Sequence, residues 1–292
     1  MGVTAVGGNN ACLNALAATF ARSTVVELIG RPHLDVFNKE RLIPPNIDLH
    51  MKLMPSPNNL VCKSAAQGQG AQQENYMLII KSVNLIICTK KLTSTAHGAL
   101  MDPTILQNMR HHLSRIDMKH LSIPANKSSI NFDNVLTGAL PDFFIVGLMS
   151  DADLAGGYQR NPFNFQNFGV NRIELKRNGT FRSSQSYTLN FANGQYIKDY
   201  MTFCQELECD TGDKSVSFTP SVWANGYTFN AFKITDDFIK PGTYGPQYKS
   251  LTGSARLEVS FAAAVNENIK VILLYQMLGR FEFDRFTKVL VL

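Results

Sequence analysis

The sequence predicts an all-β fold with a complete eight-stranded jelly roll in its C-terminal part. Short apolar or alternating segments recur from Arg115 onward with turn residues between them, as antiparallel strands do. There are eight of them, which is the strand count of a jelly roll. The 19 Phe and 9 Tyr also suit strands, which favour aromatic residues. The predicted strands are 115–123, 129–132, 142–149, 170–177, 186–191, 226–234, 254–262 and 268–277.

Three of these segments have the clearest strand patterns. Residues 143–149 form an apolar run that is long enough for a buried strand and too short to span a membrane. Residues 173–176 alternate, and the turn pair Asn178-Gly179 closes their strand. Residues 255–261 alternate with Ala, Leu, Val and Phe on one face, and we expect them to form a hairpin with residues 269–275.

Two segments have a helical pattern instead. The apolar residues of 94–114 fit helical spacing, and Pro103 can open a second helix at its first turn, so this segment is predicted to be a helical connector. Residues 196–206 are predicted to form a short helix within the β unit.

The N-terminal part predicts a further β unit. Strand-like segments occur at Val25–Gly30, Ile47–Leu53 and Tyr76–Leu92, and the Pro-, Gln- and Gly-rich residues 55–75 predict a surface loop. The predicted division of the chain is a first β unit over 1–93, a connector over 94–114 and the jelly roll over 115–292.

The composition limits the classes of function. Charged residues make up 17% of the chain, below the usual value of about 25%, and hydrophobic residues make up 45%. Such a chain suits a large buried core or a protein that buries surface in an assembly. The net charge of +5 is mild and no run of five Lys or Arg occurs, so the sequence does not predict specific nucleic-acid binding.

The five cysteines predict free thiols in a reducing compartment. Their number is odd, no Cys-x-x-Cys pair occurs, and Met1 is not followed by the apolar core of a secretory signal. The cysteines are Cys12, Cys62, Cys88, Cys204 and Cys209.

No catalytic residue, cofactor site or metal site is predicted. The adjacent pair His111-His112 would point to different faces of a helix, and no His-Glu-x-x-His motif occurs. The acids Asp151 and Asp153 fit a solvated loop better than an acid–base or calcium site. Ser150 has no Gly-x-Ser-x-Gly surround. The chain is therefore predicted not to be an enzyme.

Aromatic residues alternate with amides between Tyr158 and Phe168, in the sequence Tyr-Gln-Arg-Asn-Pro-Phe-Asn-Phe-Gln-Asn-Phe. Such rings could stack on bases beside basic pairs such as Lys176-Arg177. Alternating Phe without a basic stripe is more typical of a core or a subunit interface, which is the interpretation we favour.

Several motifs in one order resemble a known family. A strand that ends in an acidic loop precedes Asn161-Pro162-Phe163-Asn164-Phe165; a second strand and then Tyr196-x-x-Asp199-Tyr200-Met201 follow. This order is similar to the capsid proteins of Maverick/Polinton elements and adintoviruses, which resemble the double jelly-roll major capsid proteins of large DNA viruses. Further similar segments extend the resemblance over roughly residues 20–285, namely Val26–Phe37, Asn46–Leu49, Gly226–Phe229 and Arg256–Val259.

The resemblance implies a structural role. It implies a homotrimeric capsomer of pseudo-hexagonal outline whose partners are neighbouring capsomers and a penton or minor capsid protein, with no membrane span. It also implies a place in the virion, after assembly in the nucleus or cytoplasm and without secretion through a signal peptide. Members of the family carry more than a hundred residues before the matching part. We therefore expect residues 1–93 to be the remnant of a first jelly roll in an N-terminally truncated or endogenous viral copy.

The predicted interface lies in the aromatic stretch and in the short helix after it. The assembly-interface candidates are Tyr158, Asn161, Pro162, Phe163, Phe165 and Tyr200. An alternative function is a jelly-roll module that binds a ligand or glycan, domesticated by a host. The absence of a His-x-His motif weighs against a metal-binding module of the cupin type. An enzyme is the weakest alternative.

Overall fold

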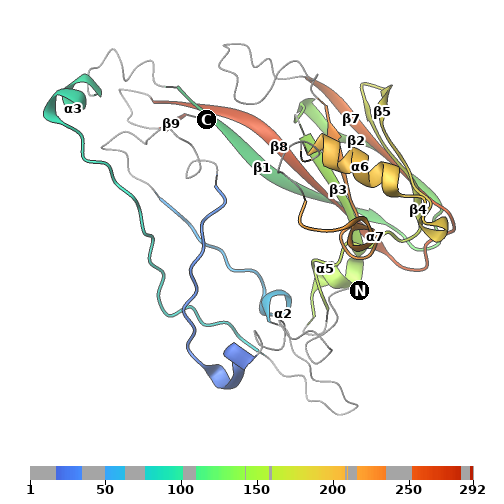
Figure 1. Ribbon diagram of the computed structural model, residues 1–292, viewed down its shortest axis with the longest axis horizontal. Coiled ribbons are helices and arrows are strands. Elements are labelled where there is room, and N and C mark those ends of the chain that lie inside the picture. Colours follow the sequence, from blue (N-terminus) through green and yellow to red (C-terminus); the bar gives the residue numbers. More distant parts are fainter. Residues whose placement is uncertain are drawn as a thin grey trace. The chain divides into compact units, whose positions relative to one another are not determined.

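The structure of the chain is a computed structural model that divides into two compact units (Figure 1). One unit comprises Met1–Glu27, Pro57–Tyr76 and Ile116–Met277, and the other comprises Leu28–Ser56, Met77–Arg115 and Leu278–Leu292. The structure describes residues 18–34, 50–62, 76–100, 110–141, 143–157, 160–207, 209, 216–234, 252–283 and 290–291.

Nine strands and several short helices are described. The strands are β1 (Arg110–Ile123), β2 (Ser129–Ala139), β3 (Phe143–Ser150), β4 (Val170–Arg177), β5 (Thr180–Thr188), β6 (Phe229–Lys233), β7 (Thr252–Phe261), β8 (Ile269–Phe283) and β9 (Leu290–Val291). The helices are η1 (Ala21–Ser23), α2 (Asn58–Val61), α3 (Ser94–Leu100), α5 (Asp151–Ala155), η3 (Phe191–Asn193), α6 (Ile197–Glu206) and α7 (Pro220–Ala224).

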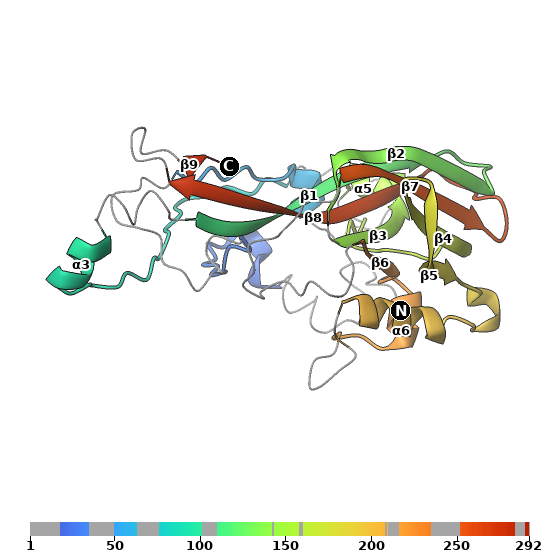
Figure 2. The same ribbon diagram turned by 90° about the horizontal axis from the view of Figure 1, so that it is seen from above.

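The order of the strands is that of a jelly roll. One sheet has the order β1-β8-β3-β6, with β9 paired to β8, and the other has the order β2-β7-β4-β5 (Figure 2). The chain crosses repeatedly between the two sheets, so that the first strand lies beside the eighth and the second beside the seventh. Two Greek keys wound over two sheets give this arrangement. The predicted all-β jelly roll is therefore confirmed.

The core lies between the two sheets. Side chains at every second position point inward, including Phe144, Val146 and Leu148 of β3. They meet Ile173 of β4 and Leu257 of β7 from the other sheet, and all five side chains are buried. This alternation produces the period-two pattern that predicted the strands.

The turn between β4 and β5 agrees with the prediction. Asn178 has φ 49° and Gly179 has φ 75°, and two positive φ values in a two-residue connection define a type I′ hairpin. The prediction began the following strand at residue 186, whereas β5 begins at Thr180. Residues 180–185 are mostly polar and lack the apolar alternation that marks a strand, although Phe181 pairs with Lys176.

The predicted hairpin of residues 255–261 with residues 269–275 is wrong. β7 pairs with β2 and β4, whereas β8 pairs with β3 in the other sheet. Alternation specifies which side chains of a strand face the core, but it does not specify the neighbouring strand. In a jelly roll these two consecutive strands lie on opposite sides of the core.

The N-terminal strand predictions and part of the connector prediction are also wrong. The described residues 24–34, 50–57 and 76–93 form neither helix nor strand, because a strand also requires a neighbour that pairs with its backbone. Helix α3 agrees with the start of the predicted connector 94–114, but residues 110–114 belong to β1. Residues 35–49 and 101–109, with Pro103, lie outside the described residues. The division at 93/94 and 114/115 stays a prediction.

Candidate assembly loop

The candidate interface residues fall mainly in the loop 160–165, which follows α5. Arg160 anchors the start of this loop. Its guanidinium lies 3.1 Å from the Asp153 carboxylate on α5, and its backbone N–H donates to Gly157 O at 3.0 Å. The other acid of this helix, Asp151, pairs with Lys270 at 3.4 Å. Asp151 and Asp153 are therefore each paired with a basic side chain.

The loop continues as a tight turn at Asn161. The side-chain Oδ1 of Asn161 accepts from the backbone N–H of Phe163 at 3.0 Å, and its carbonyl oxygen accepts from Asn164 N at 3.3 Å. Pro162 has a fixed φ, which suits the second position of such a turn. Pro162 is buried, whereas Phe163 at the tip is 72% exposed.

Phe165 anchors the other end of the loop. Its backbone N–H donates to Gly226 O at 2.9 Å, and its carbonyl accepts from Thr228 N at 3.0 Å. Its ring lies 4.5 Å from that of Phe229 and over the backbone of Gly147 in β3. A Cβ atom at Gly147 would lie 2.7 Å from Phe165 Cδ1, so this strand position has to be glycine for the ring to fit.

An aromatic cluster packs beside Phe229 of β6, the residue that the Phe165 ring contacts. It surrounds Trp223 of α7, which is fully buried and donates from Nε1 to Phe229 O at 3.0 Å. Tyr200 of α6 packs edge-on against Trp223 and donates from its hydroxyl to Phe218 O at 2.9 Å. Burial and a hydrogen bond with Cys204 raise the pKa of Tyr200. The other rings of the cluster are Phe191, Tyr196, Phe203, Phe218 and Tyr227.

The structure thus brings four of the six candidate interface residues together in one loop, where they differ in exposure. Asn161, Pro162, Phe163 and Phe165 share one loop, in which Phe163 alone presents a largely exposed ring. Tyr200 contacts the aromatic cluster, and Tyr158 lies outside the described residues.

Sequence reasoning missed the residues that hold the loop. Two sequence features could have identified them. Trp223 is the single Trp of the chain, and Gly147 is a glycine within a run of bulky apolar residues, 143–149. The ion pair of Arg160 with Asp153 also follows no pattern that the sequence displays.

Side chains also cover the free edge of β6, which is the outer strand of its sheet. The Tyr187 hydroxyl donates to Ala231 O at 2.7 Å and accepts from Ala231 N at 3.1 Å. Glu206 of α6 accepts from Lys233 N at 3.0 Å. Burial raises the pKa of Tyr187 well above its ordinary value, so its hydroxyl keeps its proton. An edge whose backbone groups are bonded in this way resists pairing with another strand.

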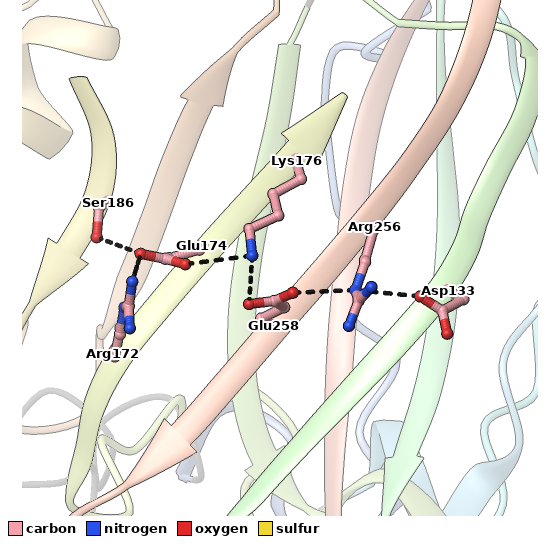
Figure 3. A network of polar contacts seen from close by, with 7 residues as sticks. All are labelled: Asp133, Arg172, Glu174, Lys176, Ser186, Arg256 and Glu258. Atoms are coloured by element: carbon pink, nitrogen blue, oxygen red, sulfur yellow. Dashed lines mark hydrogen bonds and ion pairs between the residues drawn. The ribbon is translucent and has the colours of Figure 1, made fainter. Parts of the chain in front are cut away.

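A ladder of charged side chains crosses the outer face of the other sheet (Figure 3). Arg172 donates from Nε to Glu174 at 2.6 Å, and Ser186 also donates to Glu174 at 3.0 Å. Lys176 bonds Glu258 at 2.8 Å and lies 3.9 Å from Glu174. Arg256 continues the ladder with ion pairs to Glu258 and Asp133. The ladder contains three basic and three acidic side chains, so their charges cancel. We interpret it as a network that stabilises the sheet.

The described residues hold no metal-type cluster. No group of three or more His, Cys, Asp or Glu side chains in the described ranges could hold a metal ion. The Ser150 hydroxyl donates to the Glu267 carboxylate at 2.6 Å. None of the helices in the described part of the chain is long and apolar enough to cross a membrane.

Comparison with known proteins gives similarities of structure but not of sequence. The sequence matches no protein-family model, and no curated protein matches it. The structure is similar to the major capsid protein P2 from Bacteriophage PM2, with 12% sequence identity and a TM-score of 0.24. The match covers 61% of this chain and 46% of the phage protein, so it spans less than half of that protein's length. The jelly-roll assignment rests on the strand order.

Proposed function

We propose that the chain is a structural subunit of a capsid-type shell and not an enzyme. The observation that carries this proposal is the jelly roll with a loop that is bonded at both ends and presents Phe163 to solvent. A sandwich whose β6 edge is covered is suited to packing side by side in a shell, since a covered edge does not pair with a strand of a neighbouring subunit. The order of motifs that resembles Maverick/Polinton and adintovirus capsid proteins supports the same role.

The proposed assembly is a homotrimeric capsomer of pseudo-hexagonal outline. Its partners would be neighbouring capsomers and a penton or minor capsid protein, and its place would be the virion after assembly inside the cell. Residues 76–92 support burial in an assembly, because they carry exposed apolar side chains such as Ile79 and Ile86, which are 67% and 81% exposed. Exposed apolar surface of this extent marks protein contact sites. We propose that residues 1–93 are the remnant of a first jelly roll and that their strand-like segments pair in the assembled particle.

The ligand-binding alternative has no specific observation in its favour. A glycan site would present aromatic faces to solvent. Here Phe191 and Tyr196 stack with ring centroids 5.5 Å apart and both contact Trp223. These rings therefore stabilise the fold.

Size-exclusion chromatography with light scattering tests the proposal. The 292-residue chain should elute as a particle of three times 32.4 kDa, and Phe163→Asp should shift it toward the monomer with an unchanged melting temperature. Gln166→Asp places the same charge on an exposed neighbour and should leave the trimer intact. A wild-type chain that stays monomeric at all concentrations, or a Phe163→Asp variant that still forms trimers, contradicts the proposal.

A further inference from the structure

Two cysteines lie at the C-terminal end of α6. Cys204 belongs to the last turn of the helix and is buried, with 5% of its surface exposed. Cys209 follows the end of the helix and is partly exposed, and both side chains are thiols in this structure. Neither thiol belongs to the proposed assembly contact.

A backbone hydrogen bond holds the two cysteines close together. The N–H of Cys209 donates to the carbonyl oxygen of Cys204 at 2.9 Å. A bond from the residue beyond the end of a helix back to its last turn is the main bond of a Schellman motif, and the side chains of the two bonded positions are frequently in contact. The path through this bond limits the distance between the two Cα atoms to at most about 7 Å. Cα atoms joined by a disulfide usually lie about 4.4–6.8 Å apart, so the fold places the pair within the range of a disulfide.

The ring that such a disulfide closes would contain Glu206. The carboxylate of Glu206 accepts from the backbone N–H of Lys233 at 3.0 Å and so covers the edge of β6. The last turn of a helix frays easily, because its final carbonyl groups have no partner within the helix. A disulfide across this turn would therefore hold Glu206 at the sheet edge.

We propose that Cys204 and Cys209 form a redox switch, which closes as a disulfide outside a reducing compartment and fixes the end of α6. The oxidant is a low-molecular-weight disulfide such as oxidised glutathione. The thiolate of the more exposed Cys209 attacks one sulfur of the oxidant, which forms a mixed disulfide and releases one thiolate. The thiolate of Cys204 then attacks the Cys209 sulfur and releases the second thiolate. The two protons of the cysteines pass to the released thiolates, so the oxidant leaves as two thiols.

The test is equilibration of the folded full-length chain with mixtures of oxidised and reduced glutathione. Alkylation stops the exchange, and digestion after glutamate cuts between the two cysteines at Glu206, so their peptides stay joined only by a disulfide. The equilibrium constant for this disulfide should be at least tenfold larger in the folded chain than in a synthetic peptide of residues 199–214. The fold and the disulfide must favour each other by the same factor. The oxidised chain should therefore melt about 3–6 °C higher than the reduced chain, and the amides of β6 should exchange more slowly.

Two variants separate this disulfide from other thiol chemistry. Cys209→Ser should lose both the linkage and the rise in melting temperature. Cys88→Ser removes an exposed cysteine outside α6 and should keep both. Circular dichroism verifies that each variant is folded. The proposal goes beyond the proposed function, because it concerns one chain in any state of assembly.

Three results would overturn the proposal. The first is a folded wild-type chain that carries Cys209 only as a thiol or as a mixed disulfide with glutathione at every ratio. The second is a disulfide that forms no better in the folded chain than in the peptide. The third is an equal rise in melting temperature for Cys209→Ser. Light scattering on the same samples reports assembly separately: a monomer that forms the linkage contradicts only the shell, whereas a trimer that does not form it contradicts only the switch.

Discussion

At the scale of single residues, the lack of a side chain at Gly147 determines where the loop 160–165 lies. Phe165 rests where a Cβ of Gly147 would be, and this contact joins the exposed turn to β3. The glycine is therefore required by a neighbouring ring, since its position within β3 is ordinary extended backbone.

Replacing this glycine should destabilise the protein. Gly147→Ala forces Phe165 and the adjacent Phe229 to move, and such overpacking costs about 1–3 kcal/mol of unfolding free energy. Urea unfolding followed by the fluorescence of the single Trp223 measures this loss. Gly30→Ala is the control, because no atom lies within 4 Å of a Cβ built there. Equal midpoints for the two variants would show that the ring does not depend on Gly147.

A buried carboxyl predicts how stability depends on pH. Asp199 of α6 is buried and accepts from Thr188 N at 2.9 Å. Burial raises its pKa above the ordinary value of 3.8. The folded state thus holds this proton more tightly than the unfolded state. The corresponding stability is complete below pH 3.8 and is lost as the pH rises through the raised pKa.

Asp199→Asn should therefore stabilise the protein at neutral pH. The amide keeps an acceptor oxygen for Thr188 N and removes the buried charge. Melting temperatures should be higher for the variant at pH 7, and the difference should shrink as the pH falls toward 3.8. A variant that is less stable at pH 7, or a difference that does not change with pH, would contradict the assignment.

At the scale of elements, side chains rather than strands complete the edge of a sheet. One hydroxyl of β5 bonds both backbone groups of Ala231 on β6 and so connects the two sheets. Tyr187→Phe leaves a buried N–H and a buried C=O without this partner. Such groups cost about 1–3 kcal/mol each when they are unpaired.

Because two groups lose their partner, this substitution should lower the unfolding free energy by about 2–6 kcal/mol and speed amide exchange at Ala231. Chemical denaturation and hydrogen exchange with mass spectrometry measure the two effects. Tyr227→Phe removes a hydroxyl from an exposed ring and should change neither. If exchange at Ala231 is equally slow in both variants, the hydroxyl does not protect the edge.

Burial should determine how much each end of the charge ladder contributes to the unfolding free energy. The Glu174 side chain is 2% exposed and bonds Arg172 and Ser186, whereas that of Asp133 is 68% exposed. Glu174→Gln should cost roughly 1–3 kcal/mol, because it weakens a buried charge-assisted network. Asp133→Asn should cost less than about 1 kcal/mol, as exposed ion pairs do. Thermal unfolding of both variants in low salt compares them, and equal losses would refute the ranking.

The elements also explain which features the sequence could predict. Alternation found β7 because Ala255, Leu257 and Val259 all face one core. It could not predict that β7 pairs with β2 and β4, because the face of a strand does not specify its neighbour. The motif order placed Phe163 in the candidate interface. The contacts that orient it, from Arg160 and Phe165, join residues as far apart in the sequence as Phe165 and Thr228, and only the fold brings them together.

At the scale of the whole molecule, the jelly roll and the N-terminal extended segments differ in how their apolar residues are buried. The sandwich buries Phe144 and Leu257 between two paired sheets. Residues 76–92 carry a comparable density of Ile and Leu in backbone that forms no strand. Such a segment combines a high β-propensity with exposed apolar area, which is the combination that a partner chain stabilises.

If the proposed assembly forms, protection of this segment should depend on it. Amides of residues 76–92 should exchange fast in the monomer, because they are not in a paired strand, and slow down in the trimer as pairing and burial are completed. Amides of β3 and β8 should be protected equally in both states and serve as the internal control. Hydrogen exchange on the separated chromatographic fractions compares the two. Strong protection of residues 76–92 in the monomer would mean that their backbone amides are already hydrogen-bonded within a single chain. Fast exchange in both states would mean that the trimer forms through other surfaces, such as the loop that carries Phe163.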